Sequence, residues 1–528
     1  MRAQPPTYRR DSRANHEEVH IVLSFAGRRA NIDRHDIAFA LGLGGACLVA
    51  GALTSFQLGR RSIVFDEAAT VAYARLQFPE LLHALQLSDA FFGLYYAIMH
   101  LWLRFGDSET VLRSPSVISA VAAIAAIGLL TQRLAGRRAA IIAALLAAAS
   151  APLFELGQQA RPYALLAFLS TVSTWAFVTI EERPSTARWV RYAVISTIGC
   201  YVHLFLFTVV MAHACWAASY KRTLWNRSLL YVVTGIAIAL LPLLWVLHGY
   251  PAVNAYIKRP NLHLLIDTWY WFAGSRSIAV LGLVLAIPVV VRARNHCRST
   301  RERIALLALW LLGPPLIIFA ASFGKPMYTE RYLVEAWPAY PIALGILLAR
   351  YPPPAAIGAT TALAALGIAT IFVSKTSVLQ DWRTGSEVVL REAAAGDALV
   401  VYPDRGTIPY EYYRGQFHSG GPTRIYPRRI PFPLVQNTGD ATFWEKPSGL
   451  PAASARSRRI WFLAGWNDDE RTERGIRALV ATLPRGYRLT RREHFTHETV
   501  LRFDRMSPPQ ATIPPNERGT WFRLTARL

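Results

Sequence analysis

The stretch IAFALGLGGACLVAGALTSFQLGRRSIVFDEAATVAYARL, residues 37–76, decides the fold of this 528-residue chain. Its first half, residues 37–56, is an uninterrupted apolar run of the length that crosses the hydrocarbon core of a bilayer. The run has no small-residue cleavage pattern, and two arginines follow it, so we expect a retained membrane anchor. Asp66 and Glu67 then place two adjacent carboxylates at the edge of the membrane.

The rest of the chain repeats this apolar pattern many times. Hydrophobic residues make up 53% of the chain, although its formal net charge is +23. A uniformly soluble protein does not combine these values. Runs of about 20 apolar residues predict roughly eleven transmembrane helices. The predicted spans are residues 37–56, 117–134, 139–156, 163–180, 192–207, 208–220, 229–247, 278–291, 304–323, 334–348 and 355–373.

The distribution of positive charge predicts how the chain crosses the membrane. All basic clusters fall on one side if the N-terminus is cytoplasmic, as the excess of Lys and Arg in cytoplasmic loops requires. This excess near anionic headgroups accounts for much of the net charge, so nucleic acid is not implied as a partner. We expect a multi-pass protein of the plasma (inner) membrane with an extracytoplasmic C-terminus. The clusters lie before residue 35 and at residues 133–138, 183–191, 221–227 and 292–303.

Changes in composition divide the chain into three parts. Residues 1–35 are Arg-rich and polar, and we expect a disordered cytoplasmic tail. Residues 36–379 form the predicted transmembrane domain, in which residues 59–113 are the first outer loop. Amphipathic stretches in that loop, residues 78–86 and 93–105, predict helices that lie along the membrane interface.

Residues 380–528 have the pattern of a small extracytoplasmic α/β domain. Short apolar runs at 398–402, 460–464 and 500–503 predict strands, because Gly, Pro and charged residues separate them. Residues 475–483 predict a helix, and residues 414–454 predict a long loop. The expected architecture is therefore an α-helical polytopic membrane protein of about eleven transmembrane helices with a C-terminal α/β domain.

Four outward-facing segments contain polar residues suited to chemistry. They hold Asp66 and Glu67 with Asp89 downstream, then Arg161, then His203, and finally a cluster near residues 325–332. Carboxylates there could deprotonate a hydroxyl group or hold a divalent cation. Cations there could bind a phosphate. The combination suits a lipid-linked phosphosugar whose tail stays in the bilayer. The cluster consists of Lys325, Tyr328, Glu330, Arg331 and Tyr332.

Structural explanations also exist for these residues. The two acids stand where a helix N-terminus favours negative charge. Arg161 and Arg331 can snorkel to the interface, and Tyr328 fits an aromatic belt. His203 can be a hydrogen-bonded core histidine. Convergence of the acids and the cations on one membrane face favours a functional site.

The order of four motifs resembles the GT-C superfamily. The motifs are FDEAATV (65–71), GLYYAIMHLWLRFGDSETVLRSPS (93–116), QQARPYALL (158–166) and KPMYTERYLVEAWPAYP (325–341). The chain is most similar to protein O-mannosyltransferase-like family 39 enzymes, in particular actinobacterial mannosyltransferase-like members. QDWRTGSEVVLREAAAGDALVVY (380–402) resembles the start of their outer soluble domain. The resemblance implies a polyprenyl-phosphate sugar donor, inversion at the anomeric carbon, and a catalytic carboxylate in the first outer loop. Mannose as the sugar rests on this family analogy and not on any residue of the chain.

The resemblance also implies a role for each candidate residue. Asp66 is the expected general base, and Glu67 is expected to orient the acceptor or to help position a cation. Arg161 and Arg331, assisted by Lys325, are expected to neutralise the donor phosphate. Tyr163 and His203 are expected to line the pocket for the lipid phosphate or the sugar. The acceptor pocket is expected to be lined by Asp89, Tyr95, Tyr96 and Tyr328.

Two departures from the family pattern affect these expectations. Gln159 stands where many relatives carry an acid, so a divalent cation (Mg²⁺ or Mn²⁺) would need Glu155 or Asp89 as a substitute ligand, or metal dependence is lost. The His-Pro-Pro-Leu-Tyr pattern of relatives is replaced by residues 92–96, Phe-Gly-Leu-Tyr-Tyr, and Asp89 upstream is then expected to serve the acceptor pocket.

The sequence therefore predicts an inverting membrane glycosyltransferase, with mannose as the sugar by family analogy. The acceptor is an extracytoplasmic glycan, lipid or protein. Two alternatives stay open. A transporter or flippase of a lipid-linked glycan would use the same cations without forming a glycosidic bond. A noncatalytic envelope-assembly subunit would need its soluble domain but not Asp66.

Overall fold

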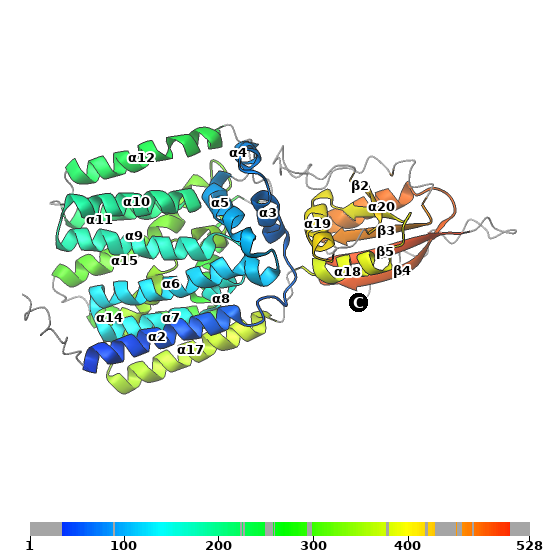
Figure 1. The fold of residues 1–528 in the computed structure, drawn as a ribbon. Coiled ribbons are helices and arrows are strands. Elements are labelled where there is room, and N and C mark those ends of the chain that lie inside the picture. Colours follow the sequence, from blue (N-terminus) through cyan, green and yellow to red (C-terminus); the bar gives the residue numbers. More distant parts are fainter. Residues whose placement is uncertain are drawn as a thin grey trace, which may run out of the picture.

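The computed structural model describes residues 34–87, 90–221, 224, 227–248, 257, 259–292, 298–375, 380–417, 421–427, 450, 457–466 and 469–506. The expected N-terminal tail lies outside these residues except for its last two. A bundle of helices forms one part of the molecule, and a sheet domain stands at one end of the bundle (Figure 1). The helices of the bundle are α2 (Arg34–Ser55), α6 (Glu109–Ala135), α7 (Arg137–Ala148), α8 (Ala151–Gly157), α9 (Tyr163–Glu182), α10 (Thr186–Val202), α11 (Leu206–Tyr220), α12 (Arg227–His248), α13 (Leu262–Ala273), α14 (Arg276–Arg292), α15 (Arg298–Ala321), α16 (Ala339–Leu348) and α17 (Pro353–Lys375).

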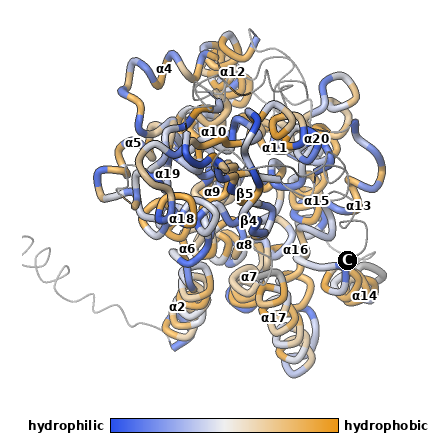
Figure 2. The backbone as a smooth tube through the Cα atoms, turned by 90° about the vertical axis from the view of Figure 1, so that its right-hand side faces the viewer, coloured by the Kyte–Doolittle hydropathy of each residue, from blue (hydrophilic) through white to orange (hydrophobic). Residues whose placement is uncertain are grey.

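The surface of the bundle is that of a membrane protein. Helix α2 exposes Leu41 and Leu48 at 71% and 76%, while its small residues Ala46 and Ala50 are buried. Large apolar side chains gathered on an open surface are stable in lipid and not in water. Helix α17, also hydrophobic along its length in Figure 2, exposes Ile357 and Val373 at 67% and 73%. The expectation of a multi-pass membrane protein is confirmed.

Helix length and composition, over the described residues, leave the expected count of eleven spans untested. Six helices are long and apolar enough to cross a bilayer, namely α2, α6, α9, α12, α15 and α17. The pairs α7–α8 and α13–α14 bend by 60° and 84°, and counting each pair as one span gives up to eight. Helices α11 and α16 are shorter apolar helices. Two details differ from the predicted spans: α13 lies between the spans predicted at 229–247 and 278–291, and residues 334–338 precede α16 instead of belonging to it.

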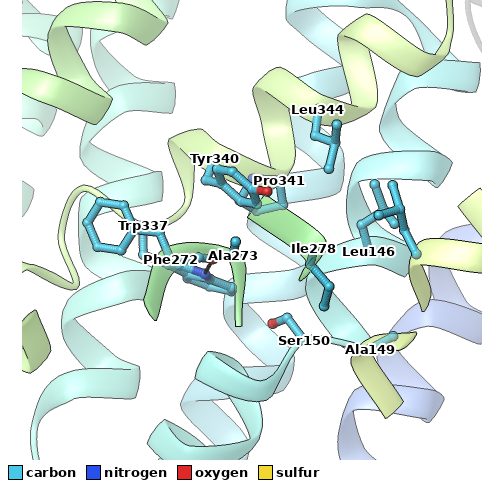
Figure 3. Close-up of a pocket in the computed structure, with 12 residues that line it drawn as sticks. Leu146, Ala149, Ser150, Phe272, Ala273, Ile278, Trp337, Tyr340, Pro341 and Leu344 are labelled. Atoms are coloured by element: carbon cyan, nitrogen blue, oxygen red, sulfur yellow. Dashed lines mark hydrogen bonds between the residues drawn. The ribbon is translucent and has the colours of Figure 1, made fainter. Parts of the chain in front are cut away.

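A small apolar cavity marks the place where the two bent pairs meet. Its volume is about 20 Å³, and its lining includes Ser150 at the α7–α8 break and Ile278 of α14 (Figure 3). Phe272, Trp337 and Tyr340 enclose it from the other elements. A cavity of about 10–15 Å³ by this measure holds one water molecule, so this cavity is too small for a sugar or a polyprenyl chain. It is a packing gap at the bends.

The connection between α2 and α6 is built from short helices. They are α3 (Phe65–Ala74), α4 (Phe78–Leu87), η1 (Ala90–Phe92), α5 (Gly93–Trp102) and η2 (Leu103–Phe105). The two amphipathic helices expected in this loop are therefore present. Helix α3 begins with a capping box, in which the Glu67 side chain accepts a hydrogen bond from the Val64 backbone N–H at 3.1 Å. This cap fixes the first turn of α3, which carries Asp66.

The sheet domain has five strands in the order β2-β1-β3-β5-β4. Strand β1 is parallel to β2 and β3, and β5 is antiparallel to β3 and β4. The predicted strands at 398–402, 460–464 and 500–503 and the predicted helix at 475–483 are all present. The elements are α18 (Trp382–Glu392), β1 (Ala398–Tyr402), η5 (Asp404–Gly406), α19 (Thr407–Gln416), β2 (Thr423–Tyr426), β3 (Arg459–Gly465), α20 (Glu470–Ala481), β4 (Tyr487–Phe495) and β5 (Glu498–Arg505).

The predicted loop at 414–454 is wrong in part. It contains the end of α19 and the strand β2, while residues 418–420, 428–449 and 451–454 lie outside the described residues. Strand β2 has only four residues, too few to show a period in the sequence. Strand β4 was also missed, because its sequence YRLTRREHF is mostly polar and its side chains are largely exposed.

Candidate functional site

The site is centred on an ion pair between two distant segments. Asp66 lies in the first turn of α3, and Arg331 lies in η4 (Glu330–Leu333), which precedes α16. The Nη1 group of Arg331 donates a hydrogen bond to Oδ2 of Asp66 at 2.9 Å. Both side chains stay partly accessible, at 31% for Asp66 and 40% for Arg331. The pair therefore joins two predicted site residues and leaves both open to a ligand.

The surroundings of Asp66 keep its carboxyl group ionised. Burial alone would raise the pKa of Asp66 because it disfavours the charged form. The positive charges of Arg331 and Arg161 and the hydrogen bond from Arg331 outweigh this effect and hold the pKa below its ordinary value. Asp66 is thus a carboxylate near neutral pH and can accept a proton.

Arg161 is the second cation of the site. Its side chain is 5% exposed, which is not the geometry of an arginine that snorkels to water. Its Nη1 group donates to the backbone oxygen of Asp66 at 3.3 Å. Its guanidinium carbon lies 4.6 Å from the centre of the Phe92 ring, a cation–π distance. A buried guanidinium within hydrogen-bond distance of the Asp66 backbone adds positive charge to this site.

Aromatic rings enclose the two arginines. His203, in the break between α10 and α11, lies 5.5 Å from Phe92 and 5.7 Å from Tyr332 between ring centres. Tyr163, at the start of α9, lies 6.1 Å from Tyr332. The Tyr163 hydroxyl and the Arg331 Nε are buried and have no hydrogen-bond partner among the described residues. The pocket therefore keeps donors available to a ligand, and Tyr163 and His203 lie side by side in its wall.

Glu67 faces away from this pocket. Its carboxylate forms a two-point ion pair with Arg113 of α6, with both N–O distances at 2.8 Å. It also accepts hydrogen bonds from the backbone N–H groups of Val64 and Ala160. The side chain is buried, and these partners occupy both of its oxygens. This arrangement favours a role in holding α3 over direct contact with an acceptor or a cation.

The other predicted residues are not all part of the pocket. Tyr328 is buried, and its hydroxyl lies 2.8 Å from that of Thr268 in α13. Lys325 is exposed on the surface. Tyr95 and Tyr96 are buried in α5, where the Tyr96 ring stacks on Tyr73. Asp89 lies outside the described residues.

Three residues at the site were not assigned a role from the sequence. Phe92 and Tyr332 form the aromatic wall beside the arginines. Arg113 holds Glu67 and donates to the backbone oxygen of Leu58 at 2.7 Å. A signal existed for Arg113, because an arginine at the start of a membrane helix needs a partner.

The described residues do not fit a metal ion. They contain no group of three His, Cys, Asp or Glu side chains that could hold one. Asp66 is surrounded by cations, and Glu67 is occupied by Arg113. The possible substitute ligand Glu155 lies 3.4 Å from the Trp271 indole nitrogen. No step of the chemistry below is assigned to a metal.

Comparisons with known proteins agree with this architecture. Residues 92–246 match the family model described as Dolichyl-phosphate-mannose-protein mannosyltransferase. No curated protein sequence matches the chain. The fold is similar to that of ArnT from Cupriavidus metallidurans in crystal structures bound to undecaprenyl phosphate and in the apo state. Both have a TM-score of 0.55 and 13% identity, and the alignments cover 88% of this chain and 97% and 98% of ArnT. The arabinofuranosyltransferase AftD from Mycobacteria aligns with a TM-score of 0.48 and 14% identity over 89% of this chain and 40% of AftD.

The shared fold with ArnT extends over nearly all of both chains. The match to the mannosyltransferase family model, over residues 92–246, falls within this shared fold. The resemblance inferred from the order of the sequence motifs is thereby confirmed.

Proposed function

We propose that the protein is an inverting glycosyltransferase that moves a sugar from a polyprenyl-phosphate donor to an extracytoplasmic acceptor. One observation carries the proposal: the Asp66 carboxylate accepts a hydrogen bond from Arg331 at 2.9 Å, and the buried Arg161 donates to the backbone oxygen of the same residue at 3.3 Å. An ionised base and two cations are what this reaction requires at one place. The proposed orientation has the N-terminus in the cytoplasm and the Asp66 site outside, in the plasma membrane.

The two arginines would bind the donor phosphate. Arg331 uses one N–H group on Asp66, and its Nε is buried without a partner among the described residues. A guanidinium has five N–H donors, so Arg331 can hold Asp66 and a phosphate oxygen at once. ArnT, which shares the fold, was crystallised with undecaprenyl phosphate bound. That likeness supports a polyprenyl phosphate as the carrier.

The reaction would be a single displacement. Asp66 takes the proton of an acceptor hydroxyl while that oxygen attacks the anomeric carbon of the sugar. The bond between the anomeric carbon and the phosphate oxygen breaks, and the electron pair leaves with the polyprenyl phosphate. Arg161 and Arg331 stabilise the charge that develops on this leaving group. Attack from the opposite face inverts the anomeric configuration, and no protein nucleophile is needed.

The proposed sugar is mannose. Its support is the description of the family model that matches residues 92–246. The proposed acceptor is a glycan, a lipid or a protein on the outer side of the membrane. The site itself offers an open carboxylate edge to a hydroxyl group, which all three classes carry.

Mass spectrometry of envelope lipids, glycans and glycoproteins tests the proposal. A strain without the protein should lack one hexose on a specific envelope component. Wild-type protein and the Asp267→Asn control, which changes an exposed carboxylate on α13, should both restore it. Asp66→Asn, inserted in the membrane at equal level, should not. A strain whose envelope sugars are all unchanged would contradict the proposed function.

A further inference from the structure

The sheet domain forms hydrogen bonds with the chain segment just before Asp66. This entry segment, residues 59–65, leads from α2 into α3. The Tyr413 hydroxyl of α19 accepts a hydrogen bond from the Ile63 backbone N–H at 2.7 Å and donates to Glu109 at 3.1 Å. Arg383 of α18 donates to the Gly59 backbone oxygen at 2.7 Å. Its own backbone N–H donates to the Ser62 hydroxyl at 3.0 Å, so two helices of the sheet domain hold this segment.

The contacts continue to the residue next to Asp66. The Phe65 backbone N–H donates to the Gln380 side-chain oxygen at 2.9 Å. This N–H belongs to the first turn of α3, which has no partner for it within the helix. The Phe65 ring packs edge-on against Trp466 at 5.8 Å between centres. Both the backbone and the side chain of the residue before Asp66 are therefore held by the sheet domain.

Helix α19 also contacts the other end of the α2–α6 connection, next to α6. Tyr412 donates a hydrogen bond to the Asp107 backbone oxygen at 2.8 Å, and Gln416 donates to the Asp107 carboxylate at 2.8 Å. Arg383 and Glu109 form an ion pair at 2.6 Å. Helix α19 lies directly beside α3 in Figure 1. The sheet domain thus fixes the entry and the exit of the connection that carries Asp66.

The sheet edge used for this contact is the one where open α/β sheets usually bind ligands. Strands β2, β1 and β3 are parallel in the order 2-1-3, so the crevice lies at the carboxyl ends of β1 and β3. Trp382 fills that crevice and is fully buried. A Cβ atom on Gly406 or Gly465 would lie about 2.5 Å or 2.4 Å from its ring. Trp382 therefore leaves no room for a ligand at this edge. Its ring packs against Trp466, which in turn packs against Phe65.

We propose that the sheet domain is a positioning device for the catalytic carboxylate, acting through Tyr413, Arg383 and Gln380. The inference rests on the proposed function, because it assigns these residues to the placement of Asp66 against Arg331. The Glu67–Arg113 pair holds α3 from the bundle side, and the three sheet-domain residues hold it from the other side. Misplacement of a reacting group by about 1 Å can cost a hundredfold in rate.

Full-length protein in lipid nanodiscs provides the test, with two variants and one control. Tyr413→Phe removes the hydroxyl that holds Ile63 and keeps the ring. Gln380→Leu removes the acceptor for Phe65 at similar size. Tyr410→Phe is the control, because the buried Tyr410 hydroxyl on the same helix has no hydrogen-bond partner among the described residues. Hydrogen exchange of residues 59–65 and the pH profile of glycosyl transfer are measured for each.

Both variants should speed exchange of the entry segment by about three- to tenfold, the effect of one lost hydrogen bond. We expect kcat to fall by a similar factor, with the donor KM within about twofold of wild type. The acid limb of the pH profile should move to higher pH, because Asp66 loses part of its contact with Arg331. The control should match wild type in every readout.

Two results would overturn the inference. One is faster exchange with unchanged kcat and pH profile, which would make the contacts purely structural. The other is a wild-type entry segment that exchanges as fast as an unfolded peptide. Hydrogen exchange does not require glycosyl transfer, so it tests the contacts of the sheet domain independently of the proposed function. Slow exchange of residues 59–65 in a wild-type protein that transfers no sugar would contradict the proposed function. The same result would support the contacts between the sheet domain and this segment.

Discussion

Glu67 and Arg113 form a buried ion pair, with each side chain 2% exposed and two N–O contacts of 2.8 Å. The pair joins the first turn of α3 to the start of α6. Because Glu67 also accepts the Ala160 backbone N–H, it links α3 to the segment that carries Arg161. The adjacent acids therefore differ in their surroundings: Glu67 is buried and paired at both oxygens, and Asp66 stays partly accessible.

Arg113→Met should destabilise the protein strongly. The variant leaves the Glu67 carboxylate buried without its partner, and breaking such a pair costs about 3–5 kcal/mol. Thermal unfolding in detergent measures the effect. Arg133→Met is the matched control, because the Arg133–Glu182 pair is about one-third exposed and should contribute at most about 1 kcal/mol. Equal losses in the two variants would show that the buried pair has no special role.

The pH dependence of transfer should report the environment of Asp66. Its pKa is lowered below the ordinary value, so the base stays ionised and active until the pH falls through that lowered pKa. Arg331→Gln removes the attraction and the hydrogen bond that lower it. The pKa should rise, and activity should be lost at a higher pH than in wild type. An acid limb of kcat/KM that does not move in this variant would contradict the assignment of Asp66 as the base.

Arg331→Gln should also slow transfer at its optimal pH. The proposed leaving phosphate would lose one cation, and removal of one such group from a transition state costs about a hundred- to a thousandfold in kcat. Lys325→Met is the comparison, because Lys325 is exposed on the surface and its auxiliary role predicts a smaller loss. Initial rates at saturating donor give both values. A larger loss for Lys325→Met would reverse the assigned roles.

Arg161→Lys should weaken binding of undecaprenyl phosphate. Lysine keeps the charge but loses the planar group that lies over Phe92 and reaches Asp66. We expect Kd to rise by about tenfold, roughly one charge-assisted hydrogen bond. Arg191→Lys is the control, since Arg191 also lies over an aromatic ring, that of Trp175. Unchanged lipid affinity in Arg161→Lys would exclude a role for Arg161 in phosphate binding.

The sequence indicated which candidate residues lie close together, but it did not indicate the contacts that hold them. Topology and motif order placed Asp66, Arg161 and Arg331 on one face, because each follows or precedes an apolar span. Nothing in the sequence distinguished Asp66 from Glu67 by burial, since that depends on Arg113, 46 positions away. The contact between Ile63 and Tyr413 spans 350 positions, and no local pattern reports it.

The same holds for the fold: elements with a strong apolar pattern of their own were predicted, and elements that depend on distant contacts were not. Strongly apolar strands such as β1 and β3 were predicted, because all their central residues are buried. Strand β4 was not predicted, because its pairing with β5 and not its own composition makes it a strand. The helix α13 was missed because its bend into α14 interrupts the apolar pattern at Gly274.

The most direct test measures the transfer of labelled mannose from polyprenyl-phosphate mannose to an acceptor, in membranes that contain the protein. Wild-type protein and Asp267→Asn should transfer labelled mannose to an endogenous acceptor, with inversion at the anomeric carbon. Asp66→Asn should retain insertion and lipid binding and lose transfer by at least about a hundredfold, the contribution of a positioned base. Transfer by Asp66→Asn at the wild-type rate would contradict the central claim.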